Sequence, residues 1–284
     1  MSQATNKTKL FSKTALTYLL LVILSILCIF PFVILIVNAT RFHSEIQKGF
    51  SLAIGSAFGD NWTKLLNDKN IPVVRALLNS VFVSTCASVL TVYFSSMTAY
   101  GIYMYKFKIR DAASNFIMLV MMVPAQVSTL GFIRLIQQMG LMDSFIPLII
   151  PAIAAPVVFF FLLQYMRSIL PYEIVEAARI DGSNEFYTFN RIVVPILSPA
   201  IAVQAIFAFV ANWNNFFLPL LILNSKEKRT IPIIIAQLRS ADYLKFDMGQ
   251  VYMMICLAIV PLLIIYLFLS RFIIRGVTMG SVKG

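Results

Sequence analysis

The sequence predicts an all-α, polytopic membrane protein with six transmembrane helices and a short helix in one cytoplasmic loop. Hydrophobic residues make up 60% of the chain and charged residues only 12%, whereas soluble domains carry about 25% charged residues. The charged residues also leave six uncharged intervals, each longer than the roughly 20 residues that a helix needs to cross a bilayer. A chain with so little polar surface requires the bilayer as its solvent.

The uncharged intervals define the expected spans. They are 14–40, 76–105, 112–133, 144–166, 192–225 and 248–270. Strands of a membrane barrel would be shorter and would alternate apolar with polar residues, which these intervals do not do. The first interval is too long for a signal-peptide core and has no small-residue cleavage site before Pro31, so we expect it to stay as a helix. We therefore predict one membrane domain at 14–275, with tails at 1–13 and 276–284.

The basic residues predict the orientation of the chain. Six spans put both termini on one side, and that side would hold 12 of the 23 basic residues, which gives no bias by raw count. The two tails and the turn Lys106–Arg110 nevertheless carry nine basic residues against one acid, Asp111. Short basic segments mark the cytoplasmic side. We expect cytoplasmic termini, external loops at 41–75 and 226–247, and an internal loop at 167–191.

The counts of cysteine and histidine exclude several kinds of chemistry. Cys28, Cys86 and Cys256 all lie in apolar intervals and are odd in number, so we expect buried thiols and no disulfide framework. His43 is the only histidine, which supports neither a metal cluster nor a histidine base within the membrane. We therefore expect no metal and no catalytic residue. No basic run is interleaved with aromatic residues, so we also expect no nucleic-acid partner.

A charged stretch, EAARIDGSNEFYTFNRIVVP at 176–195, interrupts the apolar chain and predicts a short helix at 171–182. Pro171 suits the first helical position, and Glu173 and Glu176 lie toward the positive end of the helix dipole. Gly182 can take the left-handed conformation that ends a helix. We expect a second short helix from about Asn184 to Val193, with the next span opening at Pro195.

The predicted short helix has an apolar face formed by Ile174, Ala177 and Ala178, at i, i+3 and i+4. A helix that lies on lipid headgroups usually carries Lys and Arg on its polar face and large apolar residues beneath. This helix carries acids and alanines instead. Both interpretations remain open from the residues alone, and docking to a protein is at least as well supported as docking to lipid.

The same stretch resembles a known motif. Glu176-Ala177-Ala178, followed by Gly182 and by Ile192-x-x-Pro195, resembles the EAA motif of permease subunits in binding-protein-dependent ABC importers, with Val194 where that motif usually has leucine. The stretches similar to the carbohydrate branch are EAARIDG, VPAQV, MGLMDS, FVANWNNFFLPLLIL and RGVTMGSVKG. The last looks like the end of the second permease in oligosaccharide or maltose-type importers. The resemblance covers roughly 76–284.

This resemblance implies a fold, a function and a set of partners. The fold would be that of a type I importer permease, and the function ATP-driven import of a sugar or oligosaccharide across a bacterial or archaeal cytoplasmic membrane. The implied partners are a second homologous permease, two ATP-binding subunits and an extracytoplasmic solute-binding protein. The residues implied to couple the chain to the ATPase are Glu176, Ala177, Ala178, Asp181, Gly182, Ile192 and Pro195.

The chain itself contains no GxxxxGK[ST] stretch, so we expect a transport subunit and not an enzyme. ATP and magnesium would bind to the partner ATPase subunits, and this chain would hold no cofactor. The resemblance describes the EAA segment as a coupling helix that seats on the ATPase. A short helix with defined ends and an alanine face fits that role, because it transmits force better than a flexible loop.

Amide side chains in the fifth span are the candidates for the solute path. Neutral sugars require hydrogen bonds and stacking faces instead of fixed charges. Gln204, Asn212 and Asn215 share one helical face, with Trp213 beside them. Amides within a membrane also join helices to each other, and that alternative has equal weight. Gln126 and Gln164 are weaker candidates.

Two other classes of function require residues that the spans lack. An ion-coupled secondary carrier would need charged residues or histidine within its spans, and an intramembrane hydrolase would need a base beside its nucleophile. The sequence offers neither. A non-sugar solute remains the main alternative, since the EAA motif also occurs in permeases for peptides, amino acids and polyamines. Spans without acids count against cationic solutes.

Overall fold

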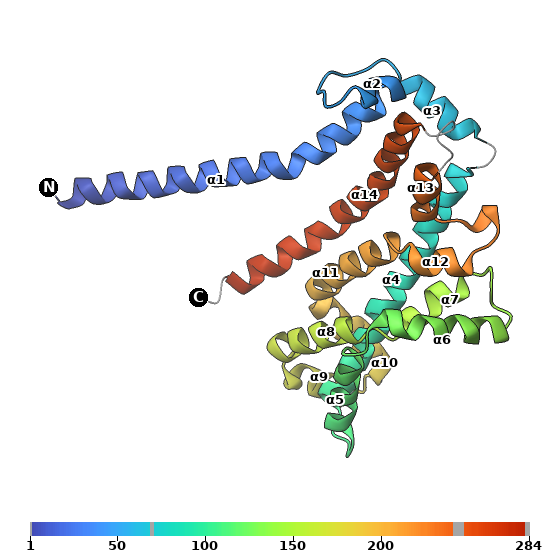
Figure 1. Cartoon of the computed structure of the whole chain (residues 1–284). Helices are drawn as coiled ribbons and strands as arrows, with labels where there is room; N and C mark the ends of the chain where they lie inside the picture. Colours follow the sequence, from blue (N-terminus) through green and yellow to red (C-terminus); the bar gives the residue numbers. More distant parts are fainter. Residues whose placement is uncertain (1, 69–70, 241–246, 282–284) are drawn as a thin grey trace. The chain divides into compact units, whose positions relative to one another are not determined.

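The computed structural model describes residues 2–68, 71–240 and 247–281, and every regular element in these residues is helical. The chain divides into two compact units (Figure 1). The first comprises Met1–Asp68 and Leu238–Leu257, and the second comprises Lys69–Gln237 and Ala258–Gly284. The predicted all-α fold class is confirmed in the described residues.

The first unit is built around the ends of two long helices. Its elements are α1 (Ser2–Ala39), α2 (His43–Gln47), α3 (Phe58–Asn67) and the beginning of α14 (Met248–Ser281). The buried amide of Asn61 donates to the carbonyl oxygens of Ala39 and Arg41, at 2.9 and 3.0 Å, and so satisfies acceptors at the end of α1. The main-chain N–H of Met248 donates to Nδ1 of His43 at 3.0 Å. The single histidine therefore has a structural hydrogen bond.

The second unit contains the remaining helices. In chain order they are α4 (Val73–Met104), α5 (Arg110–Val120), α6 (Ala125–Gln138), α7 (Ile146–Ile149), η1 (Ile150–Ile153), α8 (Pro156–Ile169), α9 (Tyr172–Ile180), α10 (Glu185–Thr188), η2 (Phe189–Val193), α11 (Val194–Trp213), α12 (Phe217–Ile222), η3 (Lys226–Lys228) and α13 (Ile231–Arg239), which crosses the boundary between the units. Within this unit, α9 and α10 lie near one end of α4, and α7 and α12 lie toward the other (Figure 1).

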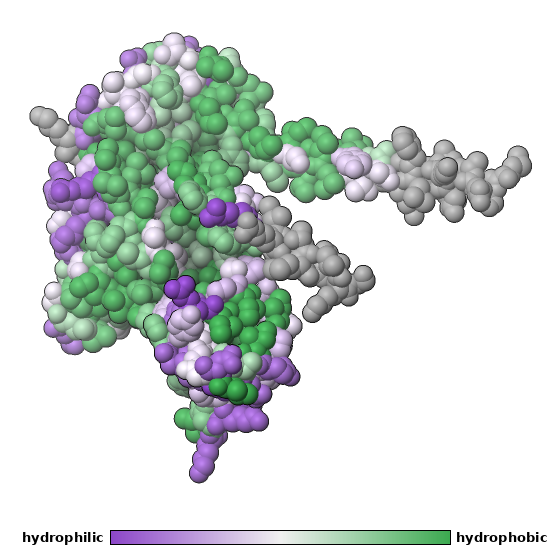
Figure 2. Space-filling model, turned by 180° about the vertical axis from the view of Figure 1, so that it is seen from behind, coloured by the Kyte–Doolittle hydropathy of each residue, from purple (hydrophilic) through white to green (hydrophobic). Residues whose placement is uncertain are grey.

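Five helices in the described residues are long and apolar enough to cross a membrane. They cover Thr14–Ala39, Val73–Met104, Ile146–Ile169, Glu185–Trp213 and Met248–Phe272. Hydrophobic residues cover most of the face seen in Figure 2, as expected where lipid replaces water. The protein is an integral membrane protein.

The third expected span, 112–133, is not one helix. Helix α5 ends at Val120 and α6 begins at Ala125, with a turn between them. Pro124 precedes α6 with an extended backbone, φ −62° and ψ 124°. Proline has no N–H to continue a helix and disfavours helical geometry in the residue before it, which explains the break.

Helix α4 is the centre of the second unit and packs against α8 and α11. The side chains that it buries recur at three- and four-residue spacing and are mostly small: Ala76, Ser80, Ser84, Ala87, Ser88, Thr91, Ser95, Ser96 and Ala99. Small residues let helix backbones approach closely inside a membrane. The hydroxyl of Thr91 donates to the carbonyl oxygen of Ala152 at 2.9 Å. That carbonyl would otherwise pair with residue 156, which is proline and has no N–H.

The expected second short helix, 184–193, is the beginning of a longer one. Helices α10, η2 and α11 run without interruption from Glu185 to Trp213. Pro195 cannot donate to the preceding turn, and the N–H of Val194 bonds instead to the carbonyl oxygen of Phe189, five residues back. This widened turn lets the helix continue past the proline. At the other end of the chain, α14 extends to Ser281, so the predicted tail 276–284 is helical in part, and 282–284 lie outside the described residues.

Candidate functional site

Helix α9 has clearly defined ends. Pro171 is the residue before the helix, with φ −66° and ψ 142°. The helix therefore begins at Tyr172, one residue later than the sequence predicts. Gly182 has φ +81°, the left-handed conformation expected from the sequence. The N–H of Ser183 donates to Ala178 O at 2.9 Å, and that of Gly182 to Arg179 O at 3.0 Å. This pair of bonds is a Schellman motif, which satisfies the last carbonyls of the helix.

The apolar residues of α9 are divided between two faces. Val175 is fully buried and Ala178 is 6% exposed, and Val175 belongs to the core formed by α4, α8 and η2. Ile174 and Ala177, expected on the same face as Ala178, are exposed, and Ile180 is 86% exposed. The chain therefore covers one side of α9 with its own core. The other side presents apolar residues beside the exposed acids Glu173, Glu176 and Asp181.

Side chains attach both ends of α9 to the rest of the unit. At its start, the ring of Tyr172 stacks on that of Tyr103 in α4, with centroids 4.6 Å apart. At its end, Nε of Arg179 donates to Oε1 of Glu185 at 2.6 Å, and the hydroxyl of Tyr100 donates to Oε2 of the same carboxylate at 2.8 Å. The guanidinium of Arg179 also lies 5.4 Å from the ring centroid of Tyr105. These contacts join α9 to α4 and to the helix that begins at Glu185.

The structure brings together four of the seven residues that the resemblance assigns to coupling. Ala178, Asp181, Gly182 and Ile192 line one hollow, together with Ser183, Asn184 and Tyr187. Glu176 and Ala177 lie on the exposed side of α9, and Pro195 is an exposed residue of α11. The aromatic residues Phe186 and Tyr187 of α10, which the sequence did not single out, are 70% and 54% exposed, and Tyr187 is one of the residues that line the hollow. Together these residues form an exposed surface of apolar, acidic and aromatic side chains.

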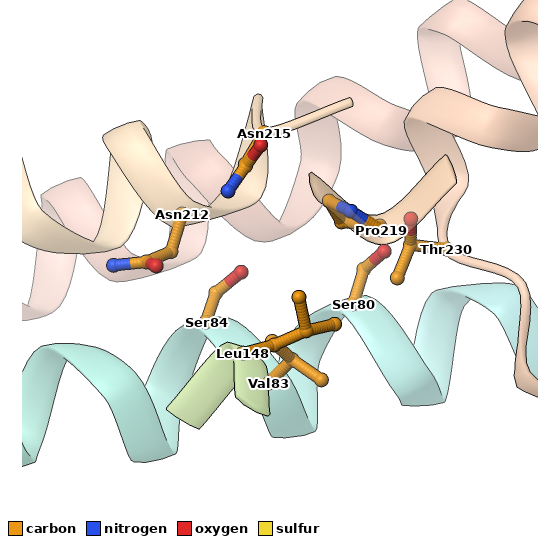
Figure 3. A pocket seen from close by; sticks show the side chains of 8 residues that line it. All are labelled: Ser80, Val83, Ser84, Leu148, Asn212, Asn215, Pro219 and Thr230. Atoms are coloured by element: carbon orange, nitrogen blue, oxygen red, sulfur yellow. The ribbon is translucent and has the colours of Figure 1, made fainter. Parts of the chain in front are cut away.

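A second candidate site is a narrow pocket between α4 and the end of α11. Its lining residues are all uncharged: Ser80, Val83, Ser84, Leu148, Asn212, Asn215, Pro219 and Thr230. Figure 3 shows the two serines on α4 facing the side that carries Asn212, Asn215 and Thr230. The cavity volume is about 10 Å³, at the lower limit for one water-sized group.

The pocket contains two of the four residues expected on the solute path. Asn212 and Asn215 line it, while Gln204 and Trp213 are buried and do not. The expected span 192–225 ends as a helix at Trp213, so Asn215 follows the helix and does not share a helical face with Gln204 and Asn212. The ring of Trp213 stacks on that of Phe209, with centroids 5.6 Å apart. Gln164 is exposed on α8, and the side chain of Gln126 lies outside the described residues. Sequence reasoning missed Ser80, Ser84 and Thr230, because a hydroxyl residue in a helix or loop gives no local sign of what it faces.

Asp143 holds the segment that leads from α12 to Thr230. Its carboxylate accepts hydrogen bonds from the N–H groups of Asn224 and Ser225, at 2.9 and 3.0 Å, and from the Ser225 hydroxyl. Nζ of Lys228 lies 3.2 Å from the same carboxylate. The hydrogen bonds from Ser225, first from its hydroxyl and then from its N–H, hold the pKa of Asp143 well below its usual range. Asp143 itself has φ +55°, which aspartate tolerates better than most residues.

The chain is similar to known proteins over most of its length. Residues 91–279 match the model of the family described as "Binding-protein-dependent transport system inner membrane component". The chain is 37% identical to the arabinooligosaccharides transport system permease protein AraQ of Bacillus subtilis, over 96% of each chain. It is 31% identical to the lactose transport system permease protein LacG of Rhizobium radiobacter, over 94% of this chain and 95% of that one.

The fold is also found among solved structures. A chain in the crystal structure of a bacterial ABC transporter involved in the import of the acidic polysaccharide alginate superposes with a TM-score of 0.77. The match covers 90% of this chain and 95% of that chain, at 19% sequence identity. At this level of identity the likeness concerns the fold.

Proposed function

Because the chain belongs to the family of inner-membrane components of binding-protein-dependent transport systems, we propose that it is the permease subunit of an ATP-driven importer for a sugar or oligosaccharide. Two similar relatives are named for arabinooligosaccharides and for lactose, which are neutral sugars. The uncharged lining of the pocket agrees with a neutral solute.

The observation that carries the proposal is the attachment of α9. One side of this helix is buried in the core, both of its ends are tied to neighbouring helices, and its other side is exposed. A helix held in this way moves with α4 and α11 as a unit. The exposed side, with Glu176, Ala177 and Ile180, is the surface that we assign to the ATPase.

The proposed assembly contains a second homologous permease, two ATP-binding subunits and an extracytoplasmic solute-binding protein. ATP and magnesium act in the ATP-binding subunits, and this chain supplies the membrane path without hydrolysing ATP. Both termini lie in the cytoplasm, which places the loop 167–191 beside the ATPase and the loops 41–75 and 226–247 outside. In this orientation, the pocket with Asn212 and Asn215 lies toward the outer end of the fifth span.

The transport cycle follows from these attachments. Closure of the two ATPase subunits displaces α9, and the contacts of Tyr172 with Tyr103 and of Arg179 with Glu185 pass the displacement to the spans. The spans then separate or close around the solute, and Asn212 and Asn215 offer it hydrogen bonds in place of water. An importer of the same architecture for a peptide, an amino acid or a polyamine is the alternative.

Reconstituted transport tests the proposal. The chain would be purified with its partner subunits, placed in proteoliposomes with the binding protein, and supplied with ATP inside the vesicles. We expect ATP-dependent uptake of at least one of three sugars: arabinotriose, lactose and maltose. Uptake of a dipeptide, an amino acid or spermidine, without uptake of any of the three sugars, would contradict it.

A further inference from the structure

The hydroxyl of Thr230 is buried in the pocket between α4 and the end of α11 and has no hydrogen-bond partner in the part of the chain that the structure describes. Thr230 is 4% exposed, and its Oγ1 atom is buried with no partner among the described residues. The residue lines the same pocket as Asn212, Asn215 and Ser84 (Figure 3). A buried hydroxyl is usually paired, because its desolvation is costly when it is not. An unpaired hydroxyl beside a cavity is a place where a polar group can bind.

The position of Thr230 is fixed by its neighbours on both sides. The N–H of Ile231 donates to Oγ of Ser80 at 2.8 Å, in a buried hydrogen bond. The amide of Asn79 donates to the carbonyl oxygens of Glu227 and Arg229, at 2.8 and 3.0 Å. Because the backbone is anchored immediately before and after Thr230, the missing partner is not explained by a loose segment.

The size and polarity of the pocket restrict what it can hold. Its cavity volume of about 10 Å³ excludes a sugar ring and suits one hydroxyl group. Ser84, 1% exposed, lines the pocket from α4 and adds a second hydroxyl, one turn from Ser80, which is the serine beside Thr230 in Figure 3. None of the eight lining residues is charged, so the pocket has no group to balance the charge of an ionic ligand.

We infer that this pocket is a subsite for one hydroxyl group of a neutral, polyhydroxylated solute, with Thr230 and Ser84 as its hydrogen-bonding groups and Asn215 at its rim. The inference rests on the proposed function and adds to it a place where one part of the solute is recognised. The sugar ring stays outside the pocket. A solute that lacks the hydroxyl leaves Thr230 unpaired.

The test compares a sugar with its deoxy derivatives in wild-type and variant importers. Thr230→Val removes the hydroxyl and keeps the shape of the side chain, and Thr230→Ser keeps the hydroxyl. Thr85→Val is the matched control, because Thr85 is exposed on α4 outside the pocket. Uptake of whichever of arabinotriose, lactose or maltose the wild type transports, and of its monodeoxy derivatives, is measured per assembled complex.

We expect the wild type to discriminate about tenfold in uptake efficiency against one deoxy derivative. Thr230→Val should transport the parent sugar about tenfold less well and should therefore no longer distinguish it from the deoxy derivative. Thr230→Ser and Thr85→Val should discriminate as the wild type does. Assembly of Thr230→Val should be normal, since replacing an unpaired buried hydroxyl with a methyl group costs little. If Thr230→Val does not assemble, Ser84→Ala provides the same comparison.

Two results would overturn the inference in distinguishable ways. Sugar uptake with the same discrimination in wild type and in the pocket variants would exclude the subsite and leave the proposed function intact. Uptake of a dipeptide, an amino acid or spermidine by the wild type, without uptake of any of the three sugars, would overturn the proposed function, and the inference with it.

Discussion

Arg179 in the last turn of α9 and Glu185 in the first turn of α10 form an ion pair with 2.6 Å between Nε and Oε1. The pair joins the end of the exposed helix to the start of the long helix that continues to Trp213. Both side chains are more than a third exposed, 35% and 42%. Its contribution to stability is therefore small, roughly 0.2–1 kcal/mol, and we assign it the role of a mechanical link.

Arg179→Ala should loosen coupling without preventing assembly. The variant removes the link between α9 and α10, so ATP hydrolysis should continue while less sugar enters per ATP consumed. The measurement is the ratio of ATP hydrolysed to sugar transported in proteoliposomes. Arg110→Ala is the control, because Arg110 forms an ion pair with Asp111, its neighbour in α5, and not with a residue of α9 or α10. An unchanged ratio in Arg179→Ala would contradict the role of this pair.

Gly182→Val should impair transport by straining the end of α9. A β-branched residue at φ +81° costs about 1–2 kcal/mol, and the Schellman motif that ends the helix would be distorted. We expect normal membrane insertion and reduced copurification of the ATPase. Gly131→Ala is the control, since its backbone lies within α6 and an added Cβ meets open space. Wild-type uptake in Gly182→Val would remove the case for a rigid α9.

Asn212→Leu and Asn215→Leu test the solute path. The amide of Asn212 donates to Ala208 O of its own helix at 2.8 Å, so it does not join two helices through that bond. If the pair lines the path, uptake per assembled complex should fall, because an unpaired sugar hydroxyl costs about 1–3 kcal/mol. If the amides join helices, the complex should instead loosen in detergent, by about 0.6 kcal/mol per bond. Asn214→Leu, at an exposed position, is the matched control.

The hydrogen bonds and the ion pair to the Asp143 carboxylate predict that the stability of the protein depends on pH. Its pKa is lower in the folded protein than the ordinary value of 3.8. The carboxylate therefore stabilises the fold fully above about pH 4, and this contribution is lost as the pH falls below that value. Asp143→Asn should lower the melting temperature of the detergent-solubilised protein at pH 7, and the difference from wild type should shrink in acid. If the melting temperatures of variant and wild type differed equally at pH 3 and pH 7, the ionised carboxylate would not be the stabilising group.

Single cysteines test the proposed orientation. Ile180 and Ile54 are similarly exposed, 86% and 81%, in the loops assigned to the inside and the outside. The native cysteines would first be replaced, since all three are free and, contrary to the expectation of buried thiols, Cys28 is exposed and Cys86 and Cys256 are partly exposed. In intact cells, an impermeant thiol reagent should label a cysteine at 54, and should label one at 180 only after permeabilisation. Labelling of both positions in intact cells would exclude this topology.

The sequence predicts well those features that depend on local composition. Five of the six uncharged intervals correspond to long apolar helices, because the absence of charge over a bilayer's thickness is itself the physical requirement for a span. Pro171 and Gly182 locate the ends of α9 to within two residues, because each restricts or permits a specific backbone conformation. The widened turn before Pro195 and the break at Pro124 show the limit: both prolines disturb a helix, and only packing decides whether it continues.

The polar pocket could be predicted only in part. Asn212 and Asn215 attract attention because amides are costly in a membrane, whereas Ser80 and Ser84 belong to a row of small residues that mostly serves close helix packing. Thr230 is separated from Ser80 by 150 positions in the sequence. Their proximity depends on the ion pair of Asp143 with Lys228 and on the hydrogen bond from Asn79 to the carbonyl oxygen of Glu227. The division of α9 into a buried and an exposed side likewise depends on the core beneath it.

Cross-linking from α9 to the ATP-binding subunit is the most direct test of the central claim, that the exposed side of this helix couples the permease to its ATPase. Cysteines at Ala177 and Ile180, in a chain without native cysteines, would be combined with a short bifunctional thiol reagent and the complete importer. We predict that both cross-link to the ATP-binding subunit and that the cross-link stops sugar uptake, while a cysteine at Ile54 does neither. Cross-linking of that subunit to other cytoplasmic positions, with none from 177 or 180, would contradict the account.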